Sequence, residues 1–358
     1  GITLVFLIVF ITGLLMTEPG SRLILRGATW ISGGVIHIEK VEGALLSDLR
    51  LEEIAISTSS MEVSIDEVES KWGGIVNIFK PLLKIDHLAV TGVTITPQNG
   101  QSENSEEKIR LPDFYWPLGI AIQHIQFNDV ILADQSGGTT QLFNTLSANI
   151  HVLNQHININ EFSVDSDQYG VSANGSIETA GDWKVQLLGD LNLDGFGFKN
   201  VVGSYKLHGP THSPQVHLEV TAPGSIQIEG QILNLLDGLE WKANLIARSV
   251  DLHSLILNCP KIELHRVIAN LAGDFDGYRG DVELDGAYAM LDDLHLESSI
   301  VADWMSIQFE SLHISRKESV ARAVDGWISW KEIFSWGGDF EFINFDLSTL
   351  PGDLTGKL

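Results

Sequence analysis

Alternation of apolar and polar residues is the feature that most constrains the fold of this chain. From residue 35 onward, apolar side chains recur at every second position in short runs, such as Ile36 and Ile38, or Leu49 and Leu51. A period of two is that of a β-strand with one buried face and one wet face. Long amphipathic helical patterns are absent after about residue 80. The pattern therefore predicts an all-β protein.

The N-terminal segment follows a different pattern. The run Ile2 to Met16 carries no charge and is apolar on every side. A membrane-spanning helix needs about 20 such residues, so the run is slightly short. It lacks a small-residue cleavage pattern, and we expect residues 1–17 to belong to an uncleaved transmembrane signal anchor. A short amphipathic helix is predicted over Ser21–Trp30, ended by Gly33 and Gly34.

Three further segments follow the anchor. Residues 18–97 are predicted to form an N-terminal β-domain, with a possible helical turn over Gly74–Phe79 that Pro81 stops. Residues 98–112 are polar and acidic, and we expect a solvated linker. Residues 113–358 return to the strand pattern, and the chain is interpreted as a fragment truncated at its C-terminal end.

An internal repeat occurs in the second half. Its unit is apolar-x-apolar-x-Gly-x-Ile in its first two copies and looser in the last two. Three copies are followed by a tryptophan. The copies are Val171–Ile177, Ile226–Ile232, Val282–Tyr288 and Arg322–Ile328, and the tryptophans are Trp183, Trp241 and Trp336.

The repeat has a structural consequence. Glycine inside a strand marks a bulge, a bend or a close backbone approach, and its repetition would bend a sheet the same way each time. We therefore expect an elongated, curved antiparallel sheet whose apolar face closes on itself or stays partly open as a groove. An ordinary closed sandwich would show the same alternation.

Composition and motifs exclude several functions. The formal net charge is −25, which argues against nucleic acid as a partner and against broad contact with anionic headgroups. The single cysteine, Cys259, forms no internal disulfide and is interpreted as a small buried hydrophobe. Walker, G-x-S-x-G, HExxH and C-x-x-C motifs are absent.

Residues that could bind a ligand have a simpler interpretation. Three histidines, His208, His212 and His217, flank a proline-rich turn and favour polar positions over a metal site. Asp274-Phe-Asp276-Gly277 matches only the start of a calcium loop. The carboxylate pairs are interpreted as solvated and the tryptophans as packing residues. No catalytic residue, metal or cofactor is predicted, and we do not expect an enzyme.

The layout resembles the N-terminal part of the TamB family, within the AsmA-like group. After the anchor, the stretch from Ile36 to Leu51 is similar to an opening x-V-x-G-x-L-x-x-L-x-L segment of that family. Leu83 to Ile95 is similar to a pattern of its first domain, L-x-I-x-x-L-x-V-x-G-x-x-I. Lys71-Trp72 lies between them, and the Gly/Trp units resemble its later repeats.

The resemblance implies a fold, a location and partners. The fold is a β-taco-like groove, reached from a single-pass anchor in the inner membrane, with most of the chain in the periplasm. The ligand is phospholipid moving toward the outer membrane, in support of outer-membrane biogenesis. A partner implied for many relatives is an Omp85-type, TamA-like outer-membrane protein linked to protein secretion.

The first hypothesis is thus a lipid conduit without enzymatic activity. Its groove would be lined by the alternate residues of each strand that face the same side. These are Ile36, Ile38, Leu49, Leu51, Leu88, Val90, Val93, Ile95, Ile157, Ile159, Phe162, Val164, Val171, Ile177, Ile226, Ile228, Leu284 and Leu294. For each of them, plain core packing is an equal alternative.

The second hypothesis is a scaffold or chaperone for outer-membrane proteins that works through strand edges. The third is an enzyme acting on cell-wall glycans, supported only by acids and tryptophans.

Overall fold

A computed structural model describes residues 15–31, 35–58, 61–76, 82–97, 115–133, 138–195, 197–235, 239–256, 261–274, 276–288, 291–303, 305–329 and 335–344. Within these residues the protein consists of strands β1 to β19 with two helices, α2 and α3. The prediction of an all-β protein is confirmed. The chain divides into two compact units, Gly1–Glu107 with Leu111–Trp183, and Lys108–Arg110 with Lys184–Leu358.

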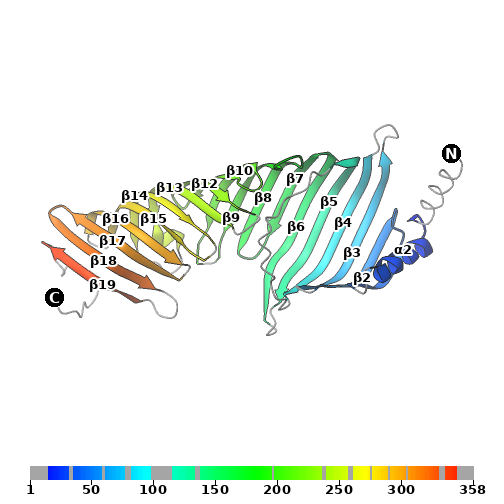
Figure 1. Ribbon diagram of the computed structural model, residues 1–358, viewed down its shortest axis with the longest axis horizontal. Coiled ribbons are helices and arrows are strands. Elements are labelled where there is room, and N and C mark those ends of the chain that lie inside the picture. The colour runs from blue at the N-terminus through cyan, green and yellow to red at the C-terminus, as the bar shows by residue number, and fades with distance from the viewer. Residues whose placement is uncertain are drawn as a thin grey trace. The chain divides into compact units, whose positions relative to one another are not determined.

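Unit 1 is a sheet with a helix at its N-terminal edge (Figure 1). Its elements are α2 (Glu18–Ile31), β1 (Ile36–Gly43), β2 (Asp48–Ser57), β3 (Met61–Val76), β4 (Leu82–Pro97), β5 (Trp116–Ala133), β6 (Thr139–Asn154), β7 (His156–Asp165) and β8 (Tyr169–Glu178).

Unit 2 is a sheet of shorter strands. Its elements are β9 (Lys184–Leu193), β10 (Val201–Pro210), β11 (Gln215–Ala222), β12 (Ser225–Leu233), β13 (Glu240–Asp251), α3 (Leu252–Leu255), β14 (Ile262–Gly273), β15 (Tyr278–Tyr288), β16 (Leu291–Asp303), β17 (Ser306–Arg316), β18 (Ser319–Ser329) and β19 (Ser335–Ile343).

Strand order follows the chain in each unit, but the prediction of a purely antiparallel sheet is wrong. Strands β4 and β5 pair in parallel, with Val90 opposite Phe127, whereas the other ladders of the described residues are antiparallel. A parallel pair needs a connection long enough to return to the starting end. Between Pro97 and Trp116 the chain supplies such a length. The sheet is therefore mixed.

A line of irregular positions crosses unit 1. Glu53, Gly92 and Asp129 have φ values of 54°, 68° and 54°, in the left-handed region. These residues have no cross-strand partner in the ladders. Pairing resumes directly after them, with Ile54 opposite Ile65 and Val93 opposite Val130. Bulges of this kind bend a strand and increase its twist. They also shift the alternation of side chains between the two faces by one residue, so that Val90 and Val93 lie on the same face.

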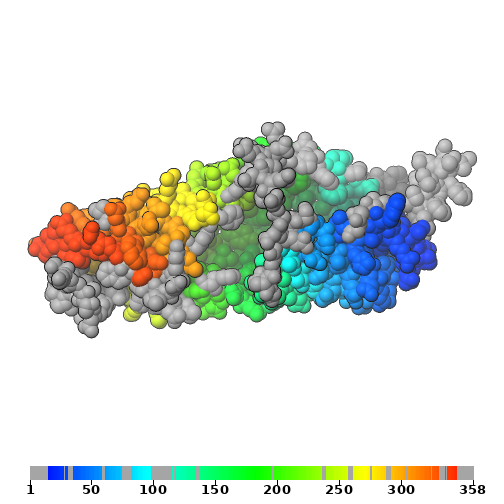
Figure 2. Space-filling view, turned by 60° about the horizontal axis from the view of Figure 1, so that its bottom comes forward, coloured from blue at the N-terminus to red at the C-terminus, as the bar shows by residue number. Residues whose placement is uncertain are grey.

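The space-filling view agrees with a bent sheet in unit 1. Figure 2 shows the surface hollowed beside the blue atoms of its N-terminal part, where green atoms lie farther from the viewer. The wider curvature of an elongated groove stays a prediction.

Helix α2 confirms the amphipathic helix predicted over Ser21–Trp30, and it is fixed to the β1–β2 turn. Ser21 is fully buried, and its Oγ accepts the backbone N–H of Leu45 at 2.8 Å. Arg22 Nε donates to the Val41 carbonyl at 3.1 Å, and the Leu46 N–H donates to the Leu15 carbonyl at 3.0 Å. These bonds set the position of α2 against the edge of the sheet.

Unit 2 has a small core at one end of its sheet. Val201, Val220, Ala247, Val250 and Val267 are buried there, and Leu255 of α3 packs among them. The side chain of Asp251 accepts the His253 N–H at 3.0 Å and so caps this single helical turn. The alternation pattern gave no sign of α3, because one turn is too short to show a helical period.

The repeats lie in strands, but not at a fixed strand interval. The four copies fall in β8, β12, β15 and β18, in that order. Two of their glycines make close backbone approaches: a Cβ added at Gly230 would lie 2.9 Å from the Lys242 carbonyl oxygen, and one at Gly286 would lie 2.5 Å from that of Glu263. The expectation of close approach is confirmed at these two glycines, and the strands that carry the last three copies, β12, β15 and β18, are three strands apart.

Some predictions fall outside the described residues. These are most of the anchor, the 98–112 linker, Cys259 and the helix-ending Gly33 and Gly34. The helical turn expected over Gly74–Phe79 is wrong for residues 74–76, which continue β3 past a register shift at Trp72. In the part of the chain that is described, no helix is long and apolar enough to cross a membrane.

Replacing Gly92 tests the bend. A Cβ at this position would overlap the Asp66 carboxylate, and φ is +68°. We expect Gly92→Ala to lower the free energy of unfolding by about 1–3 kcal/mol in urea titrations. The control is Gly170→Ala, whose Cβ would lie 3.9 Å from the nearest atom, the Val164 carbonyl oxygen. Equal effects of the two substitutions would contradict a strained bend at Gly92.

Replacing Ser21 tests the attachment of α2. Ser21→Ala leaves the Leu45 N–H without its acceptor, at a cost of about 1–2 kcal/mol. We expect the Leu45 amide to exchange its hydrogen roughly tenfold faster, as read by mass spectrometry or NMR. The exposed Ser47→Ala is the control. Unchanged exchange at Leu45 would mean that Ser21 does not hold the helix in place.

Candidate functional site

The candidate site is the apolar face of each sheet. Residues paired directly across neighbouring strands project to the same face, so the registers define rows that run perpendicular to the strands. In unit 1 one such row is apolar on every strand from β1 to β8: Val41, Leu51, Val68, Val90, Phe127, Leu146, Val164 and Val171. With strands about 4.8 Å apart, the row is roughly 34 Å long.

A second row in unit 1 lies across the bend from the first. It consists of Ile38, Ile54, Ile65, Val93, Val130 and Phe143. Val90, Val93 and Val130 from the two rows form a buried cluster. The bend therefore brings two apolar rows together instead of sending the second row to the opposite face.

Unit 2 has a comparable row from β9 to β19. Its members are apolar apart from one glycine: Leu191, Gly203, Val220, Ile226, Ala247, Val267, Leu284, Leu296, Ile314, Ala321 and Phe342. Its length by strand spacing is about 48 Å. Each unit therefore has a row of apolar residues across its strands, which we call its apolar strip.

Much of this face is only half-buried. Leu51, Val164, Ile228 and Leu284 are of intermediate exposure, whereas Val90 is buried. Besides neighbouring strands, the main contacts among described elements are those of α2 with β1 and of α3 with β13 and β14. No second layer of described elements therefore covers the strips, and their apolar side chains remain partly accessible.

The structure places all the predicted lining residues in strands. By register they share the apolar face within their unit: Ile36, Ile38, Leu49, Leu51, Leu88, Val90, Val93, Ile95, Ile157, Ile159, Phe162, Val164, Val171 and Ile177 in unit 1, and Ile226, Ile228, Leu284 and Leu294 in unit 2. Leu49, Val90 and Val93 are buried and the rest are half-buried. Contact with lipid stays a prediction.

On β1, β2 and β3 the opposite face of unit 1 carries a network of ion pairs. Lys40 Nζ lies 2.9 Å from Glu42 and 3.0 Å from Glu52. Arg50 Nε lies 2.6 Å from Glu67 and 3.1 Å from Glu52. Hydrogen bonds to Glu42 and Glu52 raise the pKa of Lys40. Exposed pairs of this kind add little stability, but they mark this face as the one that meets water.

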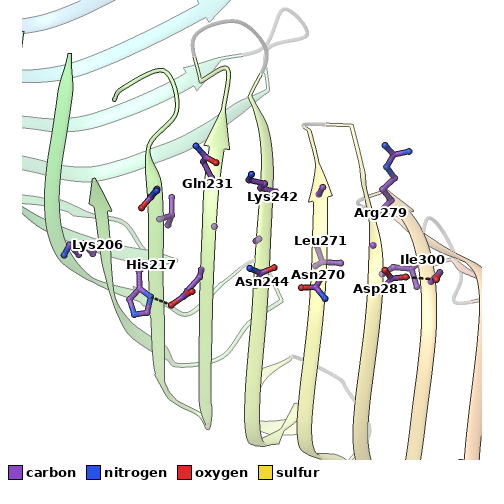
Figure 3. Close-up of a pocket in the computed structure, with 18 of the residues that line it drawn as sticks. Lys206, His217, Gln231, Lys242, Asn244, Asn270, Leu271, Arg279, Asp281 and Ile300 are labelled. Atoms are coloured by element: carbon purple, nitrogen blue, oxygen red, sulfur yellow. Dashed lines mark hydrogen bonds and ion pairs between the residues drawn. The ribbon is translucent and has the colours of Figure 1, made fainter. Parts of the chain in front are cut away.

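A cavity lined largely by polar residues lies on unit 2, and the sequence did not indicate it. It has a volume of about 940 Å³, and its lining includes Lys206, His217, Lys242, Asn244 and Arg279. Figure 3 shows these side chains on neighbouring strands, with His217 joined to Glu229 at 3.7 Å. By register they alternate with the apolar rows, so this cavity is not the apolar strip.

A second polar feature is a cluster around His295. Its Nδ1 lies 2.7 Å from Asp285 and its Nε2 3.2 Å from Glu297. Glu283, Asp285 and His295 present ligand atoms within 4.8 Å of one another. However, Arg266 Nη1 already lies 3.0 Å from Glu283 and 3.7 Å from Asp285, so the cluster is explained as an ion-pair network. Cross-strand register brings it together, and linear spacing carried no signal for it.

Titration of His295 tests this network. Hydrogen bonds to Asp285 first, and then to Glu297, raise the pKa of His295 above its usual 6.5. The protonated form is therefore favoured in the folded state. Its stabilising contribution is fully present below the ordinary pKa and is lost as the pH rises through the raised value. We expect Asp285→Asn to lower the NMR titration midpoint of His295 more than Glu297→Gln does. The reverse order would contradict the geometry.

Comparison with known proteins gives one finding. A family model described as "TamB, N-terminal domain" matches residues 7–133 and 108–358. Searches of curated proteins and of solved structures returned no match.

Proposed function

This chain belongs to the TamB family, and we propose that it carries phospholipid along the apolar strips of its two units, between the inner and outer membranes. In this proposal acyl chains lie on the apolar rows and headgroups stay in water. The protein is not an enzyme, and it sits in the inner membrane with most of its chain in the periplasm.

The unbroken row from Val41 to Val171 is the single observation that carries the proposal. A closed hydrophobic core needs apolar residues only where layers meet, whereas a lipid track needs them on every strand. Each strand of unit 1 contributes to this row. The half-burial of Leu51 and Val164, without a covering layer of described elements, leaves surface that a lipid could occupy.

The energetics support transfer without a bound nucleotide. Burial of apolar surface stabilises by about 0.8 kcal/mol per CH2 group, so an acyl chain resting on a strip recovers part of what it loses on leaving a bilayer. An acyl chain spans about half of the ~30 Å hydrocarbon core of a membrane. At about 4.8 Å per strand, it would cover three or four strands. A uniform strip gives nearly equal energy at each step, which permits movement along it.

Site-specific photocrosslinking tests the proposal. A photoreactive side chain at Leu51 or Val164 on the apolar face should capture phospholipid in cells, as read by mass spectrometry of the adduct. The matched positions Arg50 and Ser163 are their chain neighbours and face the other way. Lipid adducts at Arg50 and Ser163 equal to those at Leu51 and Val164 would contradict a one-sided track.

Charge substitution provides a functional arm of the same test. We expect Val164→Asp with Ile228→Asp to abolish phospholipid delivery to the outer membrane, because each carboxylate breaks one strip. Ser163→Asp with Gln227→Asp, on the opposite face, should leave delivery within about twofold. Circular dichroism confirms that each variant folds. A folded Val164/Ile228 variant with full delivery would exclude transport along these two strips.

The alternative is a scaffold for outer-membrane protein assembly together with an Omp85-type, TamA-like partner. Edge strands favour it, because their unpaired backbone groups can accept an added strand. Crosslinks from β19 to unfolded barrel substrates, without lipid adducts at Leu51, would favour the scaffold over the conduit.

A further inference from the structure

Helix α2 exposes an apolar stripe that the rest of the described structure does not use. Met16, Leu23 and Trp30 have exposed fractions of 60 %, 64 % and 84 %. Leu23 and Trp30 are seven residues apart on α2, which places them about 20° from one another around a helix of 3.6 residues per turn. Met16 lies just before α2, which begins at Glu18. Such exposure is uncommon for large apolar residues that follow one helix face.

The opposite side of α2 is the buried one. Ser21 is fully buried and Leu25 is half-buried. Ser21 Oγ holds the Leu45 N–H of the β1–β2 turn. The helix is therefore already packed on its inner side, and the stripe formed by Leu23 and Trp30, with Met16 just before the helix, is directed away from the sheet.

Positive charge borders this stripe. Arg22 and Arg26 are exposed and lie one turn or less from Leu23. Arg22 pairs with Glu18 at 2.6 Å, and Glu18 is the only acidic residue within α2. A locally basic helix is unusual in a chain with a net charge of −25. An apolar stripe with Trp and flanking arginines is what a helix at an anionic lipid surface requires.

We propose that α2 docks on the anionic headgroup surface of a bilayer, with Met16, Leu23 and Trp30 inserted at the boundary of headgroups and acyl chains and Arg26 on the lipid phosphates. The uncharged run Ile2–Met16, which the sequence predicts to belong to a membrane anchor, ends in the first residue of this stripe, so a bilayer is also the partner nearest along the sequence. Docking of a second protein chain on the stripe would not require an uncharged run next to it in the sequence.

Docking of α2 has a consequence for the strip of unit 1, which rests on the proposed function. The bonds from α2 reach Val41 and Leu45, and Val41 is the first residue of the row that runs to Val171. A docked helix would therefore hold the β1 end of the strip at the membrane, which makes this end the place where lipid enters.

Spin labels on the full chain test the docking. A nitroxide is attached at Leu23→Cys or Trp30→Cys in a Cys259→Ser background, with the protein reconstituted in vesicles of phosphatidylethanolamine and phosphatidylglycerol. Collisions with oxygen report lipid contact, and collisions with a water-soluble nickel chelate report water contact. We expect oxygen collisions to exceed nickel collisions at both positions.

Leu188→Cys is the matched control, because Leu188 is 59 % exposed but lies on β9 in unit 2. Its label should collide mainly with nickel. A Leu23 label with the same nickel preference as Leu188 would overturn the proposal. A Leu23 label shielded from both reagents would indicate a protein partner and would overturn it as well.

A charge substitution distinguishes docking of α2 on anionic lipids from attachment of the chain to the membrane by the run Ile2–Met16 alone. Arg26→Glu retains that run, and we expect it to cut lipid contact at Leu23 severalfold, as does replacement of the lipids by phosphatidylcholine. Arg248→Glu, at an exposed arginine of β13, should have no effect. Lipid contact at Leu23 that is insensitive to both changes would overturn the claim of an anionic surface. No readout here depends on lipid transport, so failure of docking and failure of the conduit are distinguishable.

Discussion

Cross-strand register is the constraint on which the rest of this structure depends. Alternation within one strand decides only which side chains share a face of that strand. The ladders then decide whether those faces agree from strand to strand, and a slip of one residue would invert a whole strand. Val90 opposite Phe127, and Ala247 opposite Val267, are single instances of an agreement that extends through each unit. Both the apolar strips and the polar network opposite them follow from it.

The bend in unit 1 shows how a local backbone feature preserves this agreement. A regular β4 would place Val90 and Val93 on opposite faces. The left-handed residue Gly92 between them, with Asp129 in the next strand, restores the same face while bending the sheet. Glycine tolerates such a φ without a Cβ penalty, whereas Asp129 and Glu53 adopt it at some cost. Curvature and continuity of the strip thus have one physical origin.

The sequence was sufficient for the strands, the amphipathic helix and the residues of the apolar face, because all depend on local periodicity. Val93 and Ile95 could be assigned beside Leu88 and Val90 because each pair alternates by itself. The parallel pairing of β4 with β5 could not be predicted, because apolar and polar residues alternate in the same way in parallel and antiparallel strands. The His295 cluster and the polar cavity of unit 2 were also missed. Their residues come from different strands, and only the register brings Asp285 beside His295.

The central claim is that the apolar strips hold lipid, and native mass spectrometry of the purified full chain tests it most directly. The account predicts phospholipid retained at one or more molecules per chain, and loss of that lipid when a strip residue such as Val164 is replaced by aspartate. A well-folded chain that carries no lipid, under conditions that preserve other lipid complexes, would contradict it. The half-buried face would then be the interior of a protein assembly.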